Sequence, residues 1–563
     1  MDLKELKETD IWRLYEKSVD FMSQRGIYTD TDLNYRMYNG DQWHDLKVQG
    51  IEKVQYNFIK QIVKQKVSNI TSNLYAINYS PENVENSEFL ETAQRVCDLL
   101  NKRASKVFDR DYMDSKIKKW TRQSAINDES VCYVTFNDEE LDPKNEIISK
   151  NNIMYGDENE DEIQLQPYIL IRQRKTVIEL QEMAEKEGVS KSQLQYIVGD
   201  KDVETAPGES AKYEIDDKCW LITKFYREKG TIHFSQSTRY VEIKKDRDMG
   251  ITLYPVAHFN WEDQEGNARG IGEVRQLIPN QLETNKTAMR RALSVKNTAY
   301  PQRVIDEDSI QNVSDVNKVG ATIRFKNMGQ KRASDVFMTT SPAQMSSDSE
   351  KFQSELITYS RELNNAGDSV TGNVNPESAS GKAILAVQNA QNQPLNDQLM
   401  GLKTFIENIA RIWLEMWKVY ASDGLTVEVE EADPITGEFY LKTETIPPYI
   451  LEMLSTSVKV DITPKGAFDK YAQELSLENM FIQGKISFEE YVEALDADSV
   501  MPKPKLEKIL KKRQEAQKQI NALEQQAAQI KMVAQQEQAT AMDIEGIAAI
   551  GNQMINQATQ SND

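Results

Sequence analysis

The sequence predicts an α+β protein in which helices predominate. Several long segments carry apolar residues every three or four positions, which is the period of an amphipathic helix. Between residues 131 and 261, shorter runs rich in Val, Ile, Tyr and Phe indicate strands. The chain has 563 residues, more than one hydrophobic core usually organises, so we expect about two to four modules.

Helical patterns occupy the first part of the chain. Residues 2–25 have apolar side chains at helical spacing up to Gly26, which should end the helix. A second amphipathic helix is expected over residues 54–74, and helical spacing returns over residues 85–127. The apolar face of the second predicted helix consists of Val54, Phe58, Ile62, Val67, Ile70 and Leu74.

Short strand patterns follow. We expect strands over residues 131–136, 168–171 and 255–261. The segments 220–225 and 231–234 should form a hairpin around Lys229-Gly230. Between these strands, residues 157–162 and 199–210 are acidic and rich in turn formers, which predicts loops.

Two long helical patterns enclose a strand-containing insert. The first covers residues 271–298, with Pro279 near its first turns, and the second covers residues 343–365. Between them, residues 303–305 and 321–325 have strand character and are separated by polar turns. The sequence therefore predicts a helical hairpin with a β-containing tip.

Breaker-rich and helical segments alternate in the C-terminal third. Residues 366–381 contain Gly, Asn, Pro and Ser and should be loop, whereas residues 382–420 are helical with a break near Pro394. We expect Trp413 and Trp417 to pack in a core, because they recur with other apolar residues at helical spacing. Strands are expected over residues 425–463 and helix over residues 467–498.

The tail, residues 503–563, is rich in Lys, Gln and Ala and has no aromatic residue. Apolar positions there step by four and three residues, with one polar member, as in the seam of a coiled coil. The seam positions are Ile509, Arg513, Ala516, Ile520, Leu523, Ala527, Ile530 and Ala534. A seam of this kind is buried only against other helices, so we expect self-association.

The sequence lacks the common signatures of catalysis. Its three histidines and three cysteines are widely spaced and match no zinc motif. Residues 270–275 lack the third glycine of a dinucleotide loop, and residues 376–383 lack the first glycine and the final hydroxyl of a phosphate loop. We therefore expect no catalytic residue, no metal site and no cofactor.

Charge is unevenly distributed. The net charge is −21, which opposes an ordinary nucleic-acid binder. Residues 269–332 nevertheless contain twelve basic and six acidic residues, so this segment is +6 and the remainder is −27. Either the long helices simply carry Lys and Arg on a solvated face, or the segment faces phosphates or an acidic partner. No apolar stretch approaches the ~18 residues of a membrane span, so no membrane contact is expected.

Three phrases carry a resemblance to a known family. They are YNGDQW (38–43), YPVAHFNWEDQEGNARGIGEVRQLIPNQLETNK (254–286) and GDSVTGNVNPESASGKAI (367–384), in the order helix, β insert, helix. The chain resembles the portal proteins of tailed bacteriophages over about residues 30–500, and is similar to those of short-tailed phages.

This resemblance implies a homo-oligomeric ring, commonly of twelve subunits, at one vertex of the capsid. Double-stranded DNA would pass through its channel during packaging and ejection, without sequence-specific contacts. The partners implied are the terminase, the head-to-tail adaptor or tail proteins, and the major capsid or scaffold protein. The protein would reside in the virion and, during assembly, in the host cytoplasm.

The resemblance also divides the chain into the parts of a portal. They are an N-terminal α+β part of the wing (1–268), a first stem helix (269–299), the clip (300–342), a second stem helix (343–366), the tunnel loop and a long wing helix (367–424), the wing or crown (425–502) and a C-terminal helical crown or barrel tail (503–563). The tunnel loop would be either residues 366–381 or the nearby break at Asn392–Pro394.

Candidate site residues follow from this division. The DNA-channel candidates are Lys286, Arg290, Arg291, Lys296, Asn373 and Lys382. The clip candidates, expected to face the terminase, are Arg303, Lys318, Arg324 and Lys326. The candidates for the oligomer seam are Ile509, Ile520, Leu523 and Ile530.

Two other functional classes are compatible with the residues. A virion structural or scaffold protein with a coiled-coil tail would also explain the heptad seam. A Mg²⁺-dependent DNA-processing enzyme would use acidic residues for the metal and the basic segment for its substrate.

Overall fold

The computed structural model describes residues 7–44, 53–82, 87–200, 217–300, 302–318, 320–340, 348–364, 393–432, 439–464, 477–478, 480–495, 505–506, 508–510, 512–513 and 550–554. The chain divides into two compact units, Met1–Thr463 and Pro464–Asp563. The predicted α+β class with predominant helix is confirmed. No helix of the described segments is long and apolar enough to cross a membrane.

Two helices begin the first unit. Helix α1 (Asp10–Gln24) starts at Thr9, whose hydroxyl accepts a hydrogen bond from the Trp12 N–H, and it ends before Gly26 as expected. Gly26 has a φ of 72° and leads directly into α2 (Ile27–Asn39), a helix that was not among those expected from the sequence. The glycine redirects the chain here, and a new helix follows the turn.

A five-stranded antiparallel sheet has the order β4-β5-β6-β7-β8. Its strands are β4 (Ile153–Tyr155), β5 (Tyr168–Thr176), β6 (Lys218–Glu228), β7 (Thr231–Ser237) and β8 (Glu242–Asp248). The predicted hairpin is confirmed, because β6 and β7 join through Lys229 and Gly230, both with positive φ. Consecutive side chains alternate between two cores: Trp220 packs with α1, and Leu221 packs with α6 (Val177–Lys186) and the region of α7 (Lys191–Leu194).

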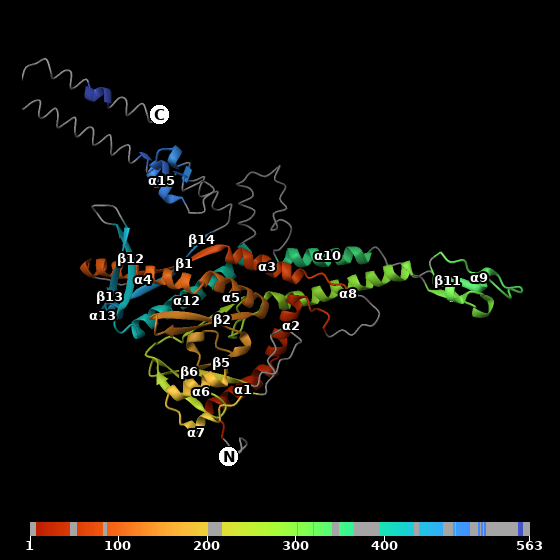
Figure 1. Ribbon diagram of the computed structural model, residues 1–563, viewed down its shortest axis with the longest axis horizontal. Helices are drawn as coiled ribbons and strands as arrows, with labels where there is room; N and C mark the ends of the chain where they lie inside the picture. Colours follow the sequence, from red (N-terminus) through yellow and green to blue (C-terminus); the bar gives the residue numbers. More distant parts are fainter. Residues whose placement is uncertain are drawn as a thin grey trace, which may run out of the picture. The chain divides into compact units, whose positions relative to one another are not determined.

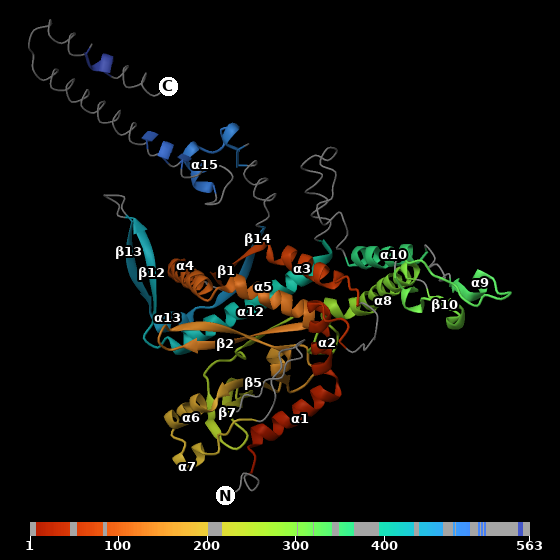
Figure 2. The same cartoon turned by 45° about the vertical axis from the view of Figure 1, so that its right-hand side comes forward.

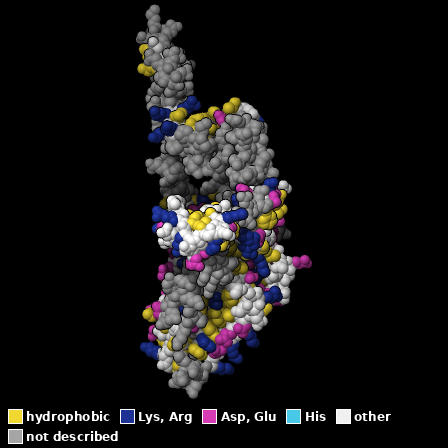
Figure 3. All heavy atoms as spheres, turned by 90° about the vertical axis from the view of Figure 1, so that its right-hand side faces the viewer, with side chains coloured by type: hydrophobic (Ala, Val, Ile, Leu, Met, Phe, Trp, Pro, Cys, Tyr) yellow, Lys and Arg dark blue, Asp and Glu magenta, His cyan; other side chains and the backbone are white. Residues whose placement is uncertain are grey.

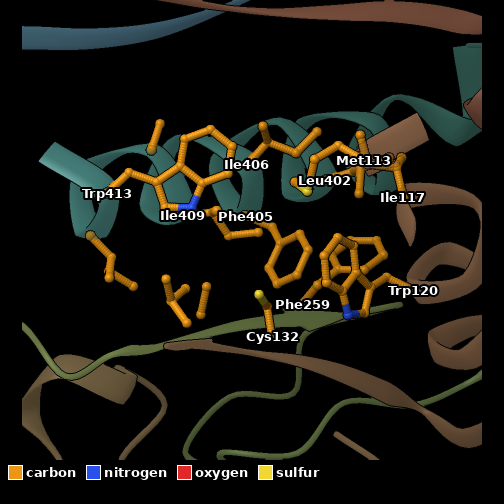
Figure 4. Packing of buried hydrophobic residues seen from close by; sticks show 14 of the residues in the cluster. Met113, Ile117, Trp120, Cys132, Phe259, Leu402, Phe405, Ile406, Ile409 and Trp413 are labelled. Carbon is orange, nitrogen blue, oxygen red and sulfur yellow. The ribbon is translucent and has the colours of Figure 1, made fainter. Parts of the chain in front are cut away.

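A second sheet of three strands has the order β3-β2-β9, with β2 (Glu129–Asn137), β3 (Asp142–Ile148) and β9 (Val256–Asn260). Helix α12 (Asn396–Tyr420), preceded by the 3₁₀ turn η6 (Gln393–Leu395), packs on it. Figure 4 shows Phe405 of α12 directed toward the sheet, near Phe259 of β9, and Trp413 further along the same helix. Trp413 and Trp417 are fully buried, so the predicted packing role is confirmed.

The region expected to be helical over residues 85–127 is two helices, α4 (Ser87–Arg110) and α5 (Met113–Asn127). The break falls at Tyr112, which has a φ of 52°. The helix predicted over 54–74 is shorter, α3 (Phe58–Thr71), because Leu74 lies in strand β1 (Asn73–Pro81). Strand β1 pairs with β14 (Thr456–Pro464), far along the chain, and this pairing ends the helical pattern.

The predicted strands over 425–463 are β12 (Leu425–Ala432), β13 (Phe439–Ile446) and β14, with a short helix α13 (Pro448–Met453) between the last two. In the second unit, α15 (Phe488–Ala494) begins with a capping box at Ser487 and contributes Tyr491 and Val492 to a small core. Much of the helix predicted over 467–498, and most of the heptad tail, lies outside the described residues.

Candidate functional site

The predicted helical hairpin is present within the first unit. Helix α8 (Glu273–Ala299) and helix α10 (Asp348–Leu363) lie side by side, and the chain between them forms a tip at one end (Figures 1 and 2). The Asn280 Nδ2 donates to Ser360 Oγ at 3.1 Å, and an Arg291 guanidinium nitrogen donates to Gln353 Oε1 at 3.0 Å. From the first contact to the second, the residue number rises along α8 and falls along α10, so the two helices are antiparallel.

The N-terminus of α8 is held by buried charges. The N–H of Gly272 donates to Asp128 Oδ1 at 2.7 Å, and the Lys150 ammonium lies 2.5 Å from the other oxygen of Asp128. A Cβ on Gly272 would lie 2.8 Å from the Asp128 backbone nitrogen, so only glycine allows this approach. Glu273, in the first turn, pairs with Lys66 of α3 at 2.7 Å. Both carboxylates also suit the positive end of the helix dipole.

A buried amide network ties the next turns of α8 to the start of α3. Gln281 Oε1 accepts from the Phe58 N–H at 3.1 Å, and Gln281 Nε2 donates to the Tyr56 carbonyl at 2.5 Å. Asn285 Oδ1 accepts from the Tyr56 N–H at 3.0 Å, and its Nδ2 donates to Gln42 Oε1 at 2.5 Å. Because Gln281 and Asn285 are fully buried, these bonds set the direction in which α8 leaves the body.

The residue pattern alone does not mark these buried polar residues as important. The available signal was that Gln281 and Thr284 continue the helical spacing of Leu277 on the buried side of α8. A polar side chain on a buried face indicates a specific partner, but the sequence does not say which one.

Arg269, the first residue of the basic segment 269–332, is buried in the body. It is 4% exposed and pairs with Glu129 and with Glu158, whose Oε2 lies 2.8 Å from Nε. Burial opposes ionisation of Glu129, but Arg269 and His258 outweigh it and lower its pKa to about 2. The Arg269 charge is therefore neutralised within the body and is not part of a basic surface.

The channel candidates on α8 do not share one face. Lys286 and Arg290 both lie near Glu283, at 3.9 and 3.1 Å, and Lys296 is exposed one to two turns further along. Arg291 instead points toward α10, where it contacts Gln353 and lies 3.6 Å from Glu350. The other two channel candidates, Asn373 and Lys382, lie outside the described residues.

Large apolar side chains on the hairpin are exposed. Phe352, Tyr359 and Leu363 of α10 are 46%, 57% and 79% exposed, and they recur at helical spacing. Val295 of α8 and Tyr300, just after it, are 69% and 76% exposed. An apolar stripe of this kind on a single chain indicates a surface that another molecule covers.

The tip has a small core of its own. Strands β10 (Arg303–Ile305) and β11 (Phe337–Thr339) pair with each other. Ile310 and Val336 are buried in the core of the tip. The tip also contains the short helix α9 (Ala333–Val336) and the 3₁₀ turns η4 (Glu307–Ser309) and η5 (Val313–Asp315). The strand predicted over 321–325 is wrong: only an isolated bridge joins Phe325 to Ile310. Too few neighbouring residues pair there to form a ladder.

All four clip candidates, Arg303, Lys318, Arg324 and Lys326, are exposed on this tip. Lys318 pairs with Asp315 at 2.7 Å, and its hydrogen bond lowers the pKa of that carboxyl. Among the described residues, no ion pair involves the other three. Figure 3, which faces this end of the hairpin, shows Lys and Arg side chains at the edges of the tip.

Of the seam candidates, only Ile509 is described. It lies in a helical stretch and is 46% exposed. Ile520, Leu523 and Ile530 lie outside the described residues.

The three cysteines are buried thiols. Burial raises the pKa of Cys97 to about 11 and that of Cys219 to about 12, so neither is poised as a thiolate. Within the described parts of the chain, no group of three or more His, Cys, Asp and Glu side chains could hold a metal ion.

No protein-family model matches the sequence, and no curated protein matches it significantly.

Proposed function

We propose that the protein is a portal protein of a tailed bacteriophage, a ring of about twelve copies that conducts double-stranded DNA through one capsid vertex. In this proposal α8 and α10 form the stem, the tip between them is the clip, and the body that carries the two larger sheets is the wing.

The hairpin is the observation that carries the proposal. Its two helices hold a separately folded tip and leave Phe352, Tyr359, Leu363, Val295 and Tyr300 exposed. A monomer gains nothing from exposing these side chains to water, whereas copies arranged around an axis would bury them against neighbouring hairpins.

The charge distribution agrees with a conduit. Arg269 and Glu273 are neutralised within the body, and the chain from residue 275 to 332 still has eleven basic and five acidic residues. The basic excess therefore belongs to the hairpin and tip, while the rest of the chain is strongly acidic. A channel must not bind DNA tightly along its whole length, because several neutralised phosphates already give strong binding.

The exposed cations of the tip support docking of an acidic surface of the terminase or the adaptor. Arg303, Arg324 and Lys326 have no ion-pair partner among the described residues, so their charges are available to a partner. Contacts at this position would follow from charge complementarity and would weaken in salt.

Class-averaged electron micrographs of the purified protein, with its sedimentation mass, test the proposal. We expect rings with a central hole and about twelve copies, and no hydrolysis of ATP or DNA. A monomer that cleaves DNA with Mg²⁺, or a particle without a central hole, would overturn it.

A further inference from the structure

A groove of about 830 Å³ lies outside the hairpin, along the edge of the three-stranded sheet. Strand β9 forms its floor, the loop around the 3₁₀ turn η3 (Ile163–Leu165) forms one wall, and one face of α12 from Asp397 to Arg411 forms the other. That face of α12 is about 20 Å long at 1.5 Å per residue, which matches a strand of about six residues. The groove is therefore long enough for an extended segment.

The edge of β9 is open along this groove. Strand β9 pairs with β2 on one side, and no described strand pairs with its other side. The Val134 N–H donates to the Pro255 carbonyl, and the Trp261 N–H donates to the Asp128 carbonyl. Because backbone groups alternate along an antiparallel strand, those of Val256, His258 and Asn260 point away from β2 and toward the groove.

Two of these three residues can be reached from solvent. Val256 is fully buried, but His258 and Asn260 are only partly buried. The His258 side chain is just 8% exposed, because it lies against Glu129, so part of the exposed surface of this residue is backbone. The outward backbone N–H and C=O groups of His258 and Asn260 form no hydrogen bond with another described residue. Such groups form a template for another strand.

The walls determine what kind of strand would fit. Five exposed carboxylates line the groove, and Arg411 is the one Lys or Arg among its lining residues. The carboxylates are those of Asp161, Glu162, Asp263, Glu265 and Asp397. None of the five forms an ion pair with a described residue, and Met400, which is 56% exposed, offers a flexible apolar contact.

A carboxyl beside the groove, that of Glu262, has a raised pKa. Burial, and then the nearby carboxylates of Glu273 and Asp397, raise the pKa of Glu262. Of these carboxylates, only Asp397 lines the groove.

We propose that the β9 groove binds an extended, Lys/Arg-rich segment of another protein as an additional edge strand. Backbone hydrogen bonds to His258 and Asn260 would supply the register, and the five carboxylates would select a basic segment. The proposed occupant is a different protein, because two copies of a chain with a net charge of −21 repel each other overall. This inference does not depend on the portal proposal, because it uses none of the hairpin residues.

The test uses the full-length protein and a fluorescent peptide with alternating Lys and Val residues, and measures binding by anisotropy. Replacing Asp161, Glu162 and Glu265 by Lys should weaken binding by about tenfold or more. The matched control replaces Glu139, Glu182 and Asp423 by Lys, since these are exposed acids elsewhere, and should change binding less than about twofold. Equal weakening in both variants, or no binding to the wild type, would overturn the proposal.

A second measurement separates strand addition from general attraction of charges. The bound peptide should slow deuterium uptake in the segment 256–260, and a peptide N-methylated at every second residue should bind at least about tenfold more weakly because its donors are missing. Unchanged deuterium uptake, or equal binding of the methylated peptide, would show that charge alone holds the peptide and would overturn the proposed strand addition. A change in sedimentation mass that the groove substitutions abolish would identify a second copy as the occupant and would also overturn the proposal.

Discussion

Lys66 of α3 and Glu273 in the first turn of α8 form a buried ion pair, with 2.7 Å between Nζ and Oε1. Their side chains are 10% and 4% exposed, and Glu273 also accepts a hydrogen bond from the Trp261 indole at 3.2 Å. The pair joins the body to the base of the hairpin, so the orientation of α8 depends on it.

Replacing Glu273 by Gln should lower the free energy of unfolding by about 3–5 kcal/mol, because the Lys66 ammonium would stay buried without its carboxylate. Urea-induced unfolding measures the change. The double variant Lys66→Met, Glu273→Leu should be more stable than Glu273→Gln, because it leaves no unpaired charge. Lys318→Ala, which removes an exposed pair on the tip, is the control and should leave the midpoint unchanged. A wild-type midpoint for Glu273→Gln would contradict the role of the pair.

Glu129 should make stability depend on acid pH. Its pKa is lowered from 4.5 to about 2 in the folded protein. A lowered folded-state pKa contributes stability above the unfolded value, and that contribution is lost as the pH falls from about 4.5 to about 2. Glu129→Gln should therefore lower the free energy of unfolding by on the order of 3 kcal/mol at pH 7, and should leave it unchanged near pH 2. Unfolding of both proteins across this range measures the difference, and a difference independent of pH would refute the assignment.

The apolar stripe of the hairpin should control assembly. Replacing Phe352, Tyr359 and Leu363 of α10 by Ser should shift the protein from rings to single chains in sedimentation velocity, with an unchanged circular dichroism spectrum. These side chains are exposed on one chain, so their loss affects association more than folding. Ile178→Ser is the control, since Ile178 is 69% exposed on α6, away from the hairpin. Intact rings in the triple variant would exclude the stripe from the interface.

The cations of α8 should divide into two kinds. Replacing Lys286, Arg290 and Lys296 by Ala should reduce the salt dependence of DNA binding by about 0.9 in the logarithmic slope for each side chain that contacts a phosphate. The unfolding midpoint should not change. Replacing Lys119, Lys191 and Lys229 removes the same charge from other exposed positions and should leave the slope unaltered.

Arg291→Ala should act on stability instead. It leaves the Oε1 of Gln353, which is 7% exposed, without its donor, at a cost of about 1–3 kcal/mol. Faster proteolysis of the hairpin at constant DNA affinity would be the signature. A change in DNA affinity alone would place Arg291 with the other three cations.

Local patterns predicted many elements correctly. The hairpin at Lys229-Gly230 follows from a glycine, which tolerates positive φ, between two strand patterns. The burial of Trp413 and Trp417 follows from their spacing. The pattern failed where a distant partner decided the outcome. Leu74 fits the helical period of α3, but it lies in a strand that pairs with β14.

The sequence by itself determined the α+β class, the two long helices around a strand-containing tip, and the basic excess between residues 269 and 332, because periodicity and charge are local properties. Only the tertiary structure decided that Arg269 is neutralised by Glu129, that Glu273 meets Lys66 207 residues away, and that the edge of β9 stays open. These features depend on which distant segments pack together, and packing is chosen by the total burial and pairing of many residues at once.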